Sequence, residues 1–177
     1  MIPLAGGGRR GHCGAMIHPP VSLHLPDPEA TASLATRLGA LLRPGDCLLL
    51  EGAIGAGKTH FSRALIQSLL VEPEDVPSPT FTLVQTYDTG AGEIWHADLY
   101  RLTDPGEVEE LGLTQAMEEA ICLIEWPDRL GDLAPTTALR LSFATDSDSE
   151  DARALTLDWT DADWTARLAQ LEEIRDD

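Results

Sequence analysis

Eight consecutive residues restrict the fold of this 177-residue chain more than any other feature. Residues 52–59 are Gly-Ala-Ile-Gly-Ala-Gly-Lys-Thr and match the pattern G-x-x-x-x-G-K-[ST] at every fixed position. An apolar run at residues 47–50 precedes them, and apolar side chains recur at helical spacing over residues 58–71. A glycine-rich loop between a buried strand and a helix is typical of α/β proteins that bind phosphate groups. The segment therefore predicts a phosphate site.

The residue types within this motif suit an anionic ligand. We expect backbone N–H groups of the loop to surround phosphate oxygens, and the positive end of the following helix to add to the attraction. The predicted ligand contacts are Gly52, Ile54, Gly55, Ala56, Gly57, Lys58 and Thr59. Lys58 reaches the terminal phosphates, and Thr59 places its hydroxyl on a magnesium ion. The alternative is an ordinary glycine-rich turn, which the strand and helix on either side disfavour.

Lys58 is the only lysine in the chain. The twelve basic residues consist of this lysine and eleven arginines. A compact ammonium group on a flexible stem fits inside a phosphate cradle, whereas the wider planar guanidinium does not. The position of the single lysine therefore favours phosphate binding over a role as surface charge.

A phosphate site that uses magnesium also needs a carboxylate at the end of a neighbouring strand. Glu125 directly follows the apolar residues 121–124, and Asp98 follows residues 94–97. Both are expected at the carboxyl edge of the sheet, where ligands bind in open α/β folds. Each could instead cap a helix or end a strand. The sequence does not separate their roles, so Lys58, Asp98 and Glu125 together form the predicted catalytic set.

Thr80 is a further candidate contact, because several phosphate-loop proteins place a threonine from this interval against the terminal phosphate. A turn built by the two nearby prolines explains Ser78 and Thr80 equally well. His96 is interpreted as a packed or hydrogen-bonded strand residue rather than a general base. The chain contains no asparagine, so it lacks the Asn-Lys-x-Asp motif that reads guanine, and ATP is the predicted nucleotide.

The remaining segments continue an alternation of strands and helices. Strands are predicted at residues 21–25, 80–87, 93–100, 121–124, 138–143 and 154–159, with a hairpin turn at 88–92. One helix is predicted to begin after Asp27. A second, short helix begins at residues 104–105, with Glu107 completing a capping box, and a final helix begins at Thr160, with Asp163 as its capping partner. The predicted fold is a three-layer α/β/α domain of the phosphate-loop NTPase type with a mixed, mainly parallel central sheet.

Composition restricts the partners and the compartment. Acidic residues outnumber basic ones by 30 to 12, and the net charge of -18 opposes direct binding to nucleic acid. Cys13, Cys47 and Cys122 lack the spacing of a zinc site or a disulfide framework, which fits a reducing compartment. No apolar run approaches the roughly 20 residues of a membrane span, so a cytoplasmic protein without membrane contact is predicted. Residues 1–20 are expected to form a disordered leader and residues 21–177 a single domain.

Four further motifs accompany the glycine-rich segment. They are Ser-Pro-Thr-Phe-Thr-Leu-Val at residues 78–84, His-Ala-Asp-Leu-Tyr-Arg-Leu at 96–102, Glu-Leu-Gly at 110–112 and Ile-Glu-Trp-Pro at 124–127. In order and spacing, from about residue 25 to residue 125 and beyond, they closely resemble the TsaE (YjeE) family of tRNA threonylcarbamoyladenosine biosynthesis factors. The chain departs from this family at Ala53, where the family usually has an acid, and in its long leader.

This resemblance implies an ATPase that binds Mg-ATP and works with the TsaB and TsaD proteins. Their combined product is N6-threonylcarbamoyladenosine at position 37 of tRNAs that read codons beginning with A. The chemistry on tRNA would belong to the partners, so this chain would meet tRNA only indirectly. ATP hydrolysis is expected to reset the TsaB and TsaD assembly between turnovers.

The resemblance also assigns roles to single residues. Thr59 and Glu125 would hold magnesium, Thr80 would act in a switch-like loop, and Asp98 would contact the nucleotide and metal. Trp126 matches a family position of functional interest, although a core or interface aromatic is the simpler interpretation. The resemblance is diffuse in the carboxyl-terminal third, so an adenine or ribose contact within residues 149–153 is only a hypothesis.

Two other functions stay open from sequence. A small-molecule kinase could use the same loop and carboxylates, with Arg101 and Arg129 as the arginines placed to help. A nucleotide-dependent binding switch would need ATP occupancy alone, with hydrolysis incidental.

Overall fold

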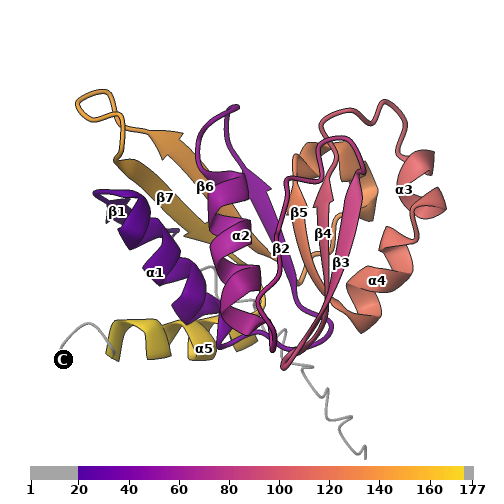
Figure 1. The fold of residues 1–177 in the computed structure, drawn as a ribbon, viewed down its shortest axis with the longest axis horizontal. Coiled ribbons are helices and arrows are strands. Elements are labelled where there is room, and N and C mark those ends of the chain that lie inside the picture. The colour runs from indigo at the N-terminus through magenta and orange to yellow at the C-terminus, as the bar shows by residue number, and fades with distance from the viewer. Residues whose placement is uncertain (1–19, 174–177) are drawn as a thin grey trace, which may run out of the picture.

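A seven-stranded sheet forms the centre of the computed structural model, which describes residues 20–173 (Figure 1). Its strands are β1 (Val21–Leu25), β2 (Cys47–Glu51), β3 (Val84–Thr89), β4 (Gly92–Asp98), β5 (Ile121–Glu125), β6 (Leu139–Thr145) and β7 (Arg153–Asp158), in the order β1-β7-β6-β2-β5-β4-β3. The four strands β6, β2, β5 and β4 pair in parallel, and both edges pair antiparallel. The predicted mixed sheet is confirmed, with its parallel part around β2. The predicted leader lies outside the described residues, apart from Pro20.

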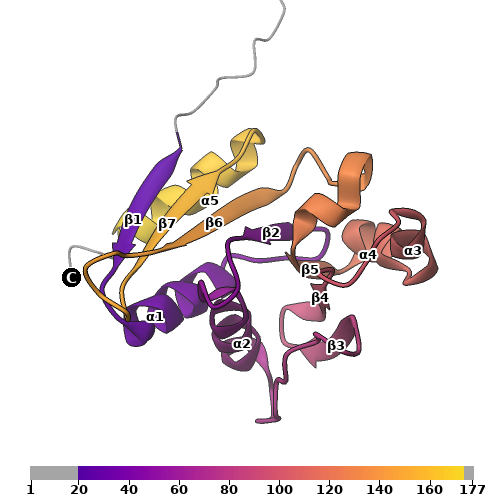
Figure 2. The ribbon, with the colours of Figure 1, turned by 90° about the horizontal axis from the view of Figure 1, so that it is seen from above.

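Helices cover both faces of this sheet (Figure 2). One core cluster receives side chains from α1 (Pro28–Gly39), α2 (Lys58–Leu69) and α5 (Ala162–Glu173), and the other from α3 (Gly106–Glu110), α4 (Leu113–Glu119) and the 3-10 helix η1 (Pro127–Leu133). Leu48 and Leu50 of β2 belong to the first cluster, whereas Cys47 and Leu49 belong to the second. Burial on both faces explains the continuous apolar run before the loop. The three-layer arrangement is as predicted.

Within residues 20–173, no helix combines the length and the apolar character that crossing a bilayer requires.

Two predicted capping boxes are wrong. Helix α3 has no side-chain cap, and Glu107 instead accepts a hydrogen bond from the Thr103 hydroxyl at 3.3 Å. At α5 the cap is Asp161, whose carboxylate accepts from the backbone amide of Asp163 at 3.0 Å. The Thr160 hydroxyl instead donates to the backbone carbonyl of Thr136, before β6, at 2.9 Å. In both cases the predicted residues hydrogen-bond other partners, and the Asp104 carboxylate accepts from the amide of Gly106 at 2.8 Å.

The start of β3 also differs from the prediction. Residues 80–83 form a turn rather than a strand. The amide of Leu83 donates to the carbonyl of Pro79 at 2.7 Å, and Leu83 has a left-handed backbone with φ of +67°. Residues 80–83 are therefore free to approach the end of β4 instead of pairing along it.

The junction between β2 and the following loop requires glycine at position 52. Gly52 has φ of +142°, and a Cβ atom there would lie 2.6 Å from the backbone oxygen of Phe143 in β6. Gly55 also has a positive φ, +79°, but a Cβ at that position meets no atom within 4 Å. Position 52 is thus restricted by a close approach of two backbones, and position 55 by its torsion angle alone.

We expect Gly52→Ala to lower the free energy of unfolding more than Gly55→Ala. Alanine at position 55 only has to adopt a left-handed conformation, which costs about 1–2 kcal/mol. Alanine at position 52 adds a clash that the loop or β6 must move to relieve. Urea denaturation of both variants beside the unsubstituted chain measures the difference, and equal destabilisation would contradict the close approach.

Candidate functional site

The predicted site residues meet at one edge of the sheet, the upper edge in Figure 1. Strands β2, β5 and β4 are parallel neighbours, so their carboxyl ends lie together. The glycine loop, residues 52–57, leaves β2 at this edge. Asp98 and Glu125 are register partners at the ends of β4 and β5, so their side chains lie side by side on the same face of the sheet.

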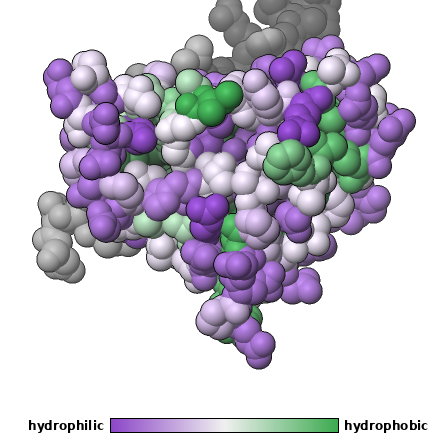
Figure 3. All heavy atoms as spheres, turned by 45° about the horizontal axis from the view of Figure 1, so that its top comes forward, coloured by the Kyte–Doolittle hydropathy of each residue, from purple (hydrophilic) through white to green (hydrophobic). Residues whose placement is uncertain are grey.

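A hollow of about 450 Å³, here called the edge hollow, opens between these elements. Of the predicted contacts it is lined by Ile54, Gly55, Gly57, Lys58, Thr59, Thr80, Asp98 and Glu125. Gly52 and Ala56 do not line it, because Gly52 lies against the backbone of β6 and the Ala56 side chain is buried. Figure 3 tilts this edge toward the viewer and shows a mainly hydrophilic surface with small groups of hydrophobic side chains. The structure thus brings together eight of the ten predicted residues.

The amino end of α2 faces this hollow without a side-chain cap. Its capping position is Gly57, with φ of +109°, and no acidic residue lies in its first turn. The first amide groups of a helix have no partner within the helix, and they carry the positive end of the helix dipole. This geometry fits an anion such as a phosphate group.

The Lys58 ammonium is held inside the glycine loop. Lys58 is only 5 % exposed, and its Nζ donates to the carbonyls of Gly52 and Ala53, the latter at 2.9 Å. The same atom lies 4.3 Å from the centroid of the Trp126 ring. Burial lowers the pKa of the Lys58 ammonium. The Glu125 and Asp98 carboxylates raise it by a smaller amount. The loop therefore presents a nearly buried ammonium group beside two carboxylates.

Glu125 is held at both carboxylate oxygens. The Thr59 hydroxyl donates to Oε2 at 3.1 Å, and Nε2 of His96 lies 2.9 Å from Oε1. Glu125 is 2 % exposed and His96 is completely buried. The interpretation of His96 as a hydrogen-bonded strand residue is confirmed.

Asp98 is joined to the loop that contains Thr80. The Thr80 hydroxyl donates to Oδ2 of Asp98 at 3.3 Å, and the Ser78 and Thr80 hydroxyls lie 2.7 Å apart. The other oxygen, Oδ1, accepts from the amide of Tyr100 at 3.0 Å. The turn, at residues 79–82, is confirmed and places Thr80 at the hollow, while a contact from Thr80 to a phosphate stays a prediction.

The oxygen atoms at this edge are too few to hold a metal by themselves, but they suit a magnesium ion that is also bound by phosphate and water. Among residues 20–173, no group of three or more His, Cys, Asp and Glu side chains could hold a metal ion. Thr59, Asp98 and Glu125 offer one hydroxyl and two carboxylates to the edge hollow. Mg²⁺ prefers oxygen ligands and commonly takes one or two carboxylates together with phosphate and water. The residues present fit a magnesium ion that arrives with a phosphate ligand.

Sequence reasoning missed two residues that line the edge hollow, His60 and Tyr100, and it missed the contact that Arg153 makes with the glycine loop. Arg153, at the start of β7, donates from Nε to the carbonyl of Ala56 at 3.0 Å. Arg153 lies within residues 149–153, where an adenine or ribose contact stays a prediction, and its bond to the glycine loop depends on the pairing of β6 with β7. No local sequence signal gives that contact.

Trp126 combines packing with a position at the site. Its ring lies 4.9 Å from that of Tyr100, and its side chain lines the edge hollow. Trp126 also has φ of +58°, which is uncommon for a bulky residue. The residue is therefore an aromatic wall of the site and also a neighbour of Lys58.

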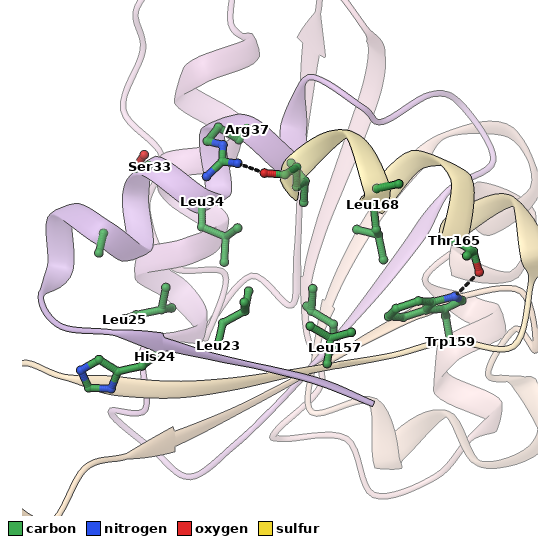
Figure 4. A pocket seen from close by; sticks show the side chains of 14 residues that line it. Leu23, His24, Leu25, Ser33, Leu34, Arg37, Leu157, Trp159, Thr165 and Leu168 are labelled. Atoms are coloured by element: carbon green, nitrogen blue, oxygen red, sulfur yellow. Dashed lines mark hydrogen bonds between the residues drawn. The ribbon is translucent and has the colours of Figure 1, made fainter. Parts of the chain in front are cut away.

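A second hollow of about 410 Å³ lies between α1 and α5, over β1 and β7 (Figure 4). Its lining is mainly apolar and includes Leu23, Leu25, Leu34, Leu157 and Leu168. Arg37 donates to the Leu171 carbonyl beside it, and the Trp159 indole donates to Thr165 at 2.9 Å. Among the described side chains, this hollow shares no residue with the edge hollow and has no carboxylate in its lining. The edge hollow is therefore the candidate functional site.

Comparison with known sequences agrees with the motifs. The family model described as "Threonylcarbamoyl adenosine biosynthesis protein TsaE" matches residues 25–155. The tRNA threonylcarbamoyladenosine biosynthesis protein TsaE of Rickettsia bellii is 41 % identical over 115 residues, which are 65 % of this chain and 80 % of that protein. The protein of the same name from Bacillus subtilis is 36 % identical over 125 residues, 70 % of this chain and 77 % of that protein.

The fold has a solved counterpart. The crystal structure of YdiB from Bacillus subtilis superimposes with a TM-score of 0.72 at 24 % sequence identity, covering 90 % of this chain and 98 % of that chain. At this identity the likeness concerns the fold alone. The match of the family model over residues 25–155, more than half of the chain, shows the family. The chain belongs to the TsaE family of threonylcarbamoyl adenosine biosynthesis proteins.

Proposed function

We propose that this chain is an ATPase of tRNA threonylcarbamoyladenosine biosynthesis that binds Mg-ATP in the edge hollow. Hydrolysis of the ATP supports turnover of a TsaB and TsaD complex in the cytoplasm. One observation carries the proposal: the buried Lys58 and the uncapped amino end of α2 line a single hollow together with Asp98 and Glu125. Positive groups and carboxylates that line the same hollow suit a nucleoside triphosphate with its magnesium ion.

The phosphates would be bound by the glycine loop and the first turn of α2. The Lys58 ammonium, which donates to the Gly52 and Ala53 carbonyls, is the donor that would turn toward the terminal phosphates. Its reduced exposure strengthens each hydrogen bond it makes, because the surroundings screen charge less than water does. Arg153 ties the loop carbonyls to β7 and so limits movement of the loop.

The metal would be held by Thr59 and Glu125, whose side chains already contact each other. Bound magnesium supplies positive charge beside the terminal phosphate. Asp98 and Thr80 also line the hollow beside Glu125, where a carboxylate can orient the attacking water. In this assignment Glu125 serves mainly the metal and Asp98 mainly the hydrolysis.

The partners are proposed from the family and from charge. A net charge of -18 disfavours direct binding of tRNA by this chain, so the chemistry on tRNA is assigned to TsaB and TsaD. A kinase is less well supported, because neither Arg101 nor Arg129 is among the residues that line the edge hollow. Arg101 stacks on the Phe81 ring at 4.3 Å instead.

We expect Lys58→Ala to lower Mg-ATP hydrolysis by about a hundredfold, because it removes a preorganised charge from the developing phosphate charge. Hydrolysis is measured with the chain alone and with TsaB plus TsaD from the same source, which should stimulate it. Arg43→Ala removes a positive charge at an exposed ion pair and is the matched control. Full activity of Lys58→Ala would overturn the proposal. A chain that binds ATP but is neither bound nor stimulated by the partners would favour the kinase.

We expect Asp98→Asn and Glu125→Gln to fail in different ways. Glu125→Gln should reduce the gain in nucleotide affinity that magnesium provides, because the metal loses a charged ligand. Asp98→Asn should retain Mg-ATP binding and lose most of its turnover. Calorimetric titration and phosphate release measure the two properties, with Glu109→Gln on exposed α3 as control. If Asp98→Asn binds ATP without hydrolysing it and still supports tRNA modification, the chain is a binding switch.

A further inference from the structure

The buried contact between His96 and Glu125 has a direction fixed by chemistry. An ionised carboxylate only accepts hydrogen bonds, so the 2.9 Å contact requires a proton on Nε2 of His96. The other ring nitrogen, Nδ1, is buried and has no hydrogen-bond partner among the described residues. A ring with its proton on Nε2 rather than on Nδ1 leaves no N–H group without a hydrogen-bond partner among the described residues. We therefore assign this tautomer to the imidazole.

Sheet geometry explains why this histidine reaches this glutamate. In the parallel pairing of β4 with β5, Asp98 is opposite Glu125, and His96 is opposite Leu123. Side chains two residues apart share a face of a strand, so His96 lies one repeat below Asp98 on the face that carries Glu125. A ring at this position reaches the neighbouring carboxylate diagonally, from within the core.

Two elements thus hold the two oxygens of one carboxylate. His96 contacts Oε1 from the sheet, and the Thr59 hydroxyl contacts Oε2 from the first turn of α2. If the bond to His96 is removed, the contact with Thr59 is the one of these two that the Glu125 side chain keeps. A magnesium ligand with freedom to rotate binds its metal more weakly than one held in a single orientation.

Neither general base catalysis nor packing accounts for an imidazole here. His96 is completely buried and is absent from the residues that line the edge hollow, so its ring cannot contact a water molecule in that hollow. An apolar side chain would fill the same volume without the cost of burying two ring nitrogens, one of which has no hydrogen-bond partner within the described part of the chain. The hydrogen bond to Glu125 is what the imidazole adds.

We propose that His96 is a positioning residue that fixes the Glu125 carboxylate so that Oε2 faces Thr59 and the edge hollow. The assignment rests on the proposed function in one respect, namely that Glu125 is a ligand of the magnesium ion. It adds a hydrogen-bond partner behind the metal ligand, within the core of the sheet. His96 itself contacts neither nucleotide nor metal.

The test compares nucleotide affinity with and without magnesium. A non-hydrolysable ATP analogue is titrated into the full chain by calorimetry, once with excess Mg²⁺ and once with EDTA. His96→Asn shortens the side chain so that it no longer reaches Oε1, whereas His96→Gln places an amide nitrogen near the position of Nε2. His24→Asn makes the same chemical change at an exposed position of β1 and is the control.

We expect His96→Asn to reduce the ratio of the affinity in Mg²⁺ to the affinity in EDTA by about tenfold, because the metal ligand loses a hydrogen-bond partner. Its affinity in EDTA should stay within about twofold of the unsubstituted chain, because the phosphate contacts are intact. His96→Gln should restore part of the ratio, and His24→Asn should leave it unchanged. An equal loss of affinity in EDTA and in Mg²⁺ would show a structural role and overturn the proposal.

A double-mutant cycle separates action through Glu125 from an independent effect. In a Glu125→Gln background, His96→Asn should change the ratio little further, because the carboxylate it positions is already gone. Effects that add in full would overturn the proposal. Nitrogen NMR of the His96 ring in the unsubstituted chain gives a check that needs no variant to fold: Nε2 should carry the proton, and a proton on Nδ1 would contradict the geometry.

Failure of the two proposals can be told apart. If the chain binds the analogue more tightly with Mg²⁺, depends on His96 for that gain, and yet hydrolyses no ATP, the positioning role stands and the ATPase proposal fails. If the affinity of the unsubstituted chain does not depend on Mg²⁺, Glu125 holds no metal and the positioning role is overturned, whatever the hydrolysis result.

Discussion

Parallel pairing brings the carboxyl ends of β2, β5 and β4 to one edge of the sheet, so the glycine loop, Glu125 and Asp98 meet although they are far apart in sequence. The register of these strands decides which way each side chain points. A slip of one residue in β5 would turn Glu125 to the opposite face and bring Ile124 to the site. Apolar residues of β2 and β5 are buried against helices on both faces, so such a slip would disrupt two cores at once. The packing that stabilises the sheet therefore also fixes the candidate site.

The polar groups at this edge are costly to bury and are stabilised by one another. Lys58, Asp98, Glu125 and His96 are all buried, and each has a partner within hydrogen-bond distance. In weakly screened surroundings an unpaired charge is unfavourable, but a paired one is held firmly. Thr59 links the cluster to α2, so the helix whose uncapped amino end faces the edge hollow is bonded to the sheet that carries the carboxylates. Movement of the loop relative to Glu125 would require breaking this contact.

The sequence predicted the parts of the site that depend on chain order. The glycine-rich motif gave the loop and the start of α2, and Glu125 and Asp98 followed from their places at the ends of apolar runs. It did not predict the bond from Arg153 to the loop, because this contact depends on how β7 pairs with β6. The capping box at Glu107 was wrong, because Thr103 provided a competing local partner. Contacts between distant elements follow from register, which a sequence pattern does not contain.

Two bulky residues with left-handed backbones show where regular structure gives way to the site. Trp126, with φ of +58°, directly follows β5, and Leu83, with φ of +67°, directly precedes β3. Such conformations cost about 1–3 kcal/mol each and persist only where the surroundings hold them. Trp126 is held by the Tyr100 ring at 4.9 Å, and the carbonyl of Leu83 accepts from the amide of Asp98 at 2.9 Å. Each strained residue turns the chain out of the sheet next to a carboxylate of the site. The favourable packing of the sheet and its helices must therefore exceed this local cost, and loosening that packing would disturb both turns before it unfolded the strands.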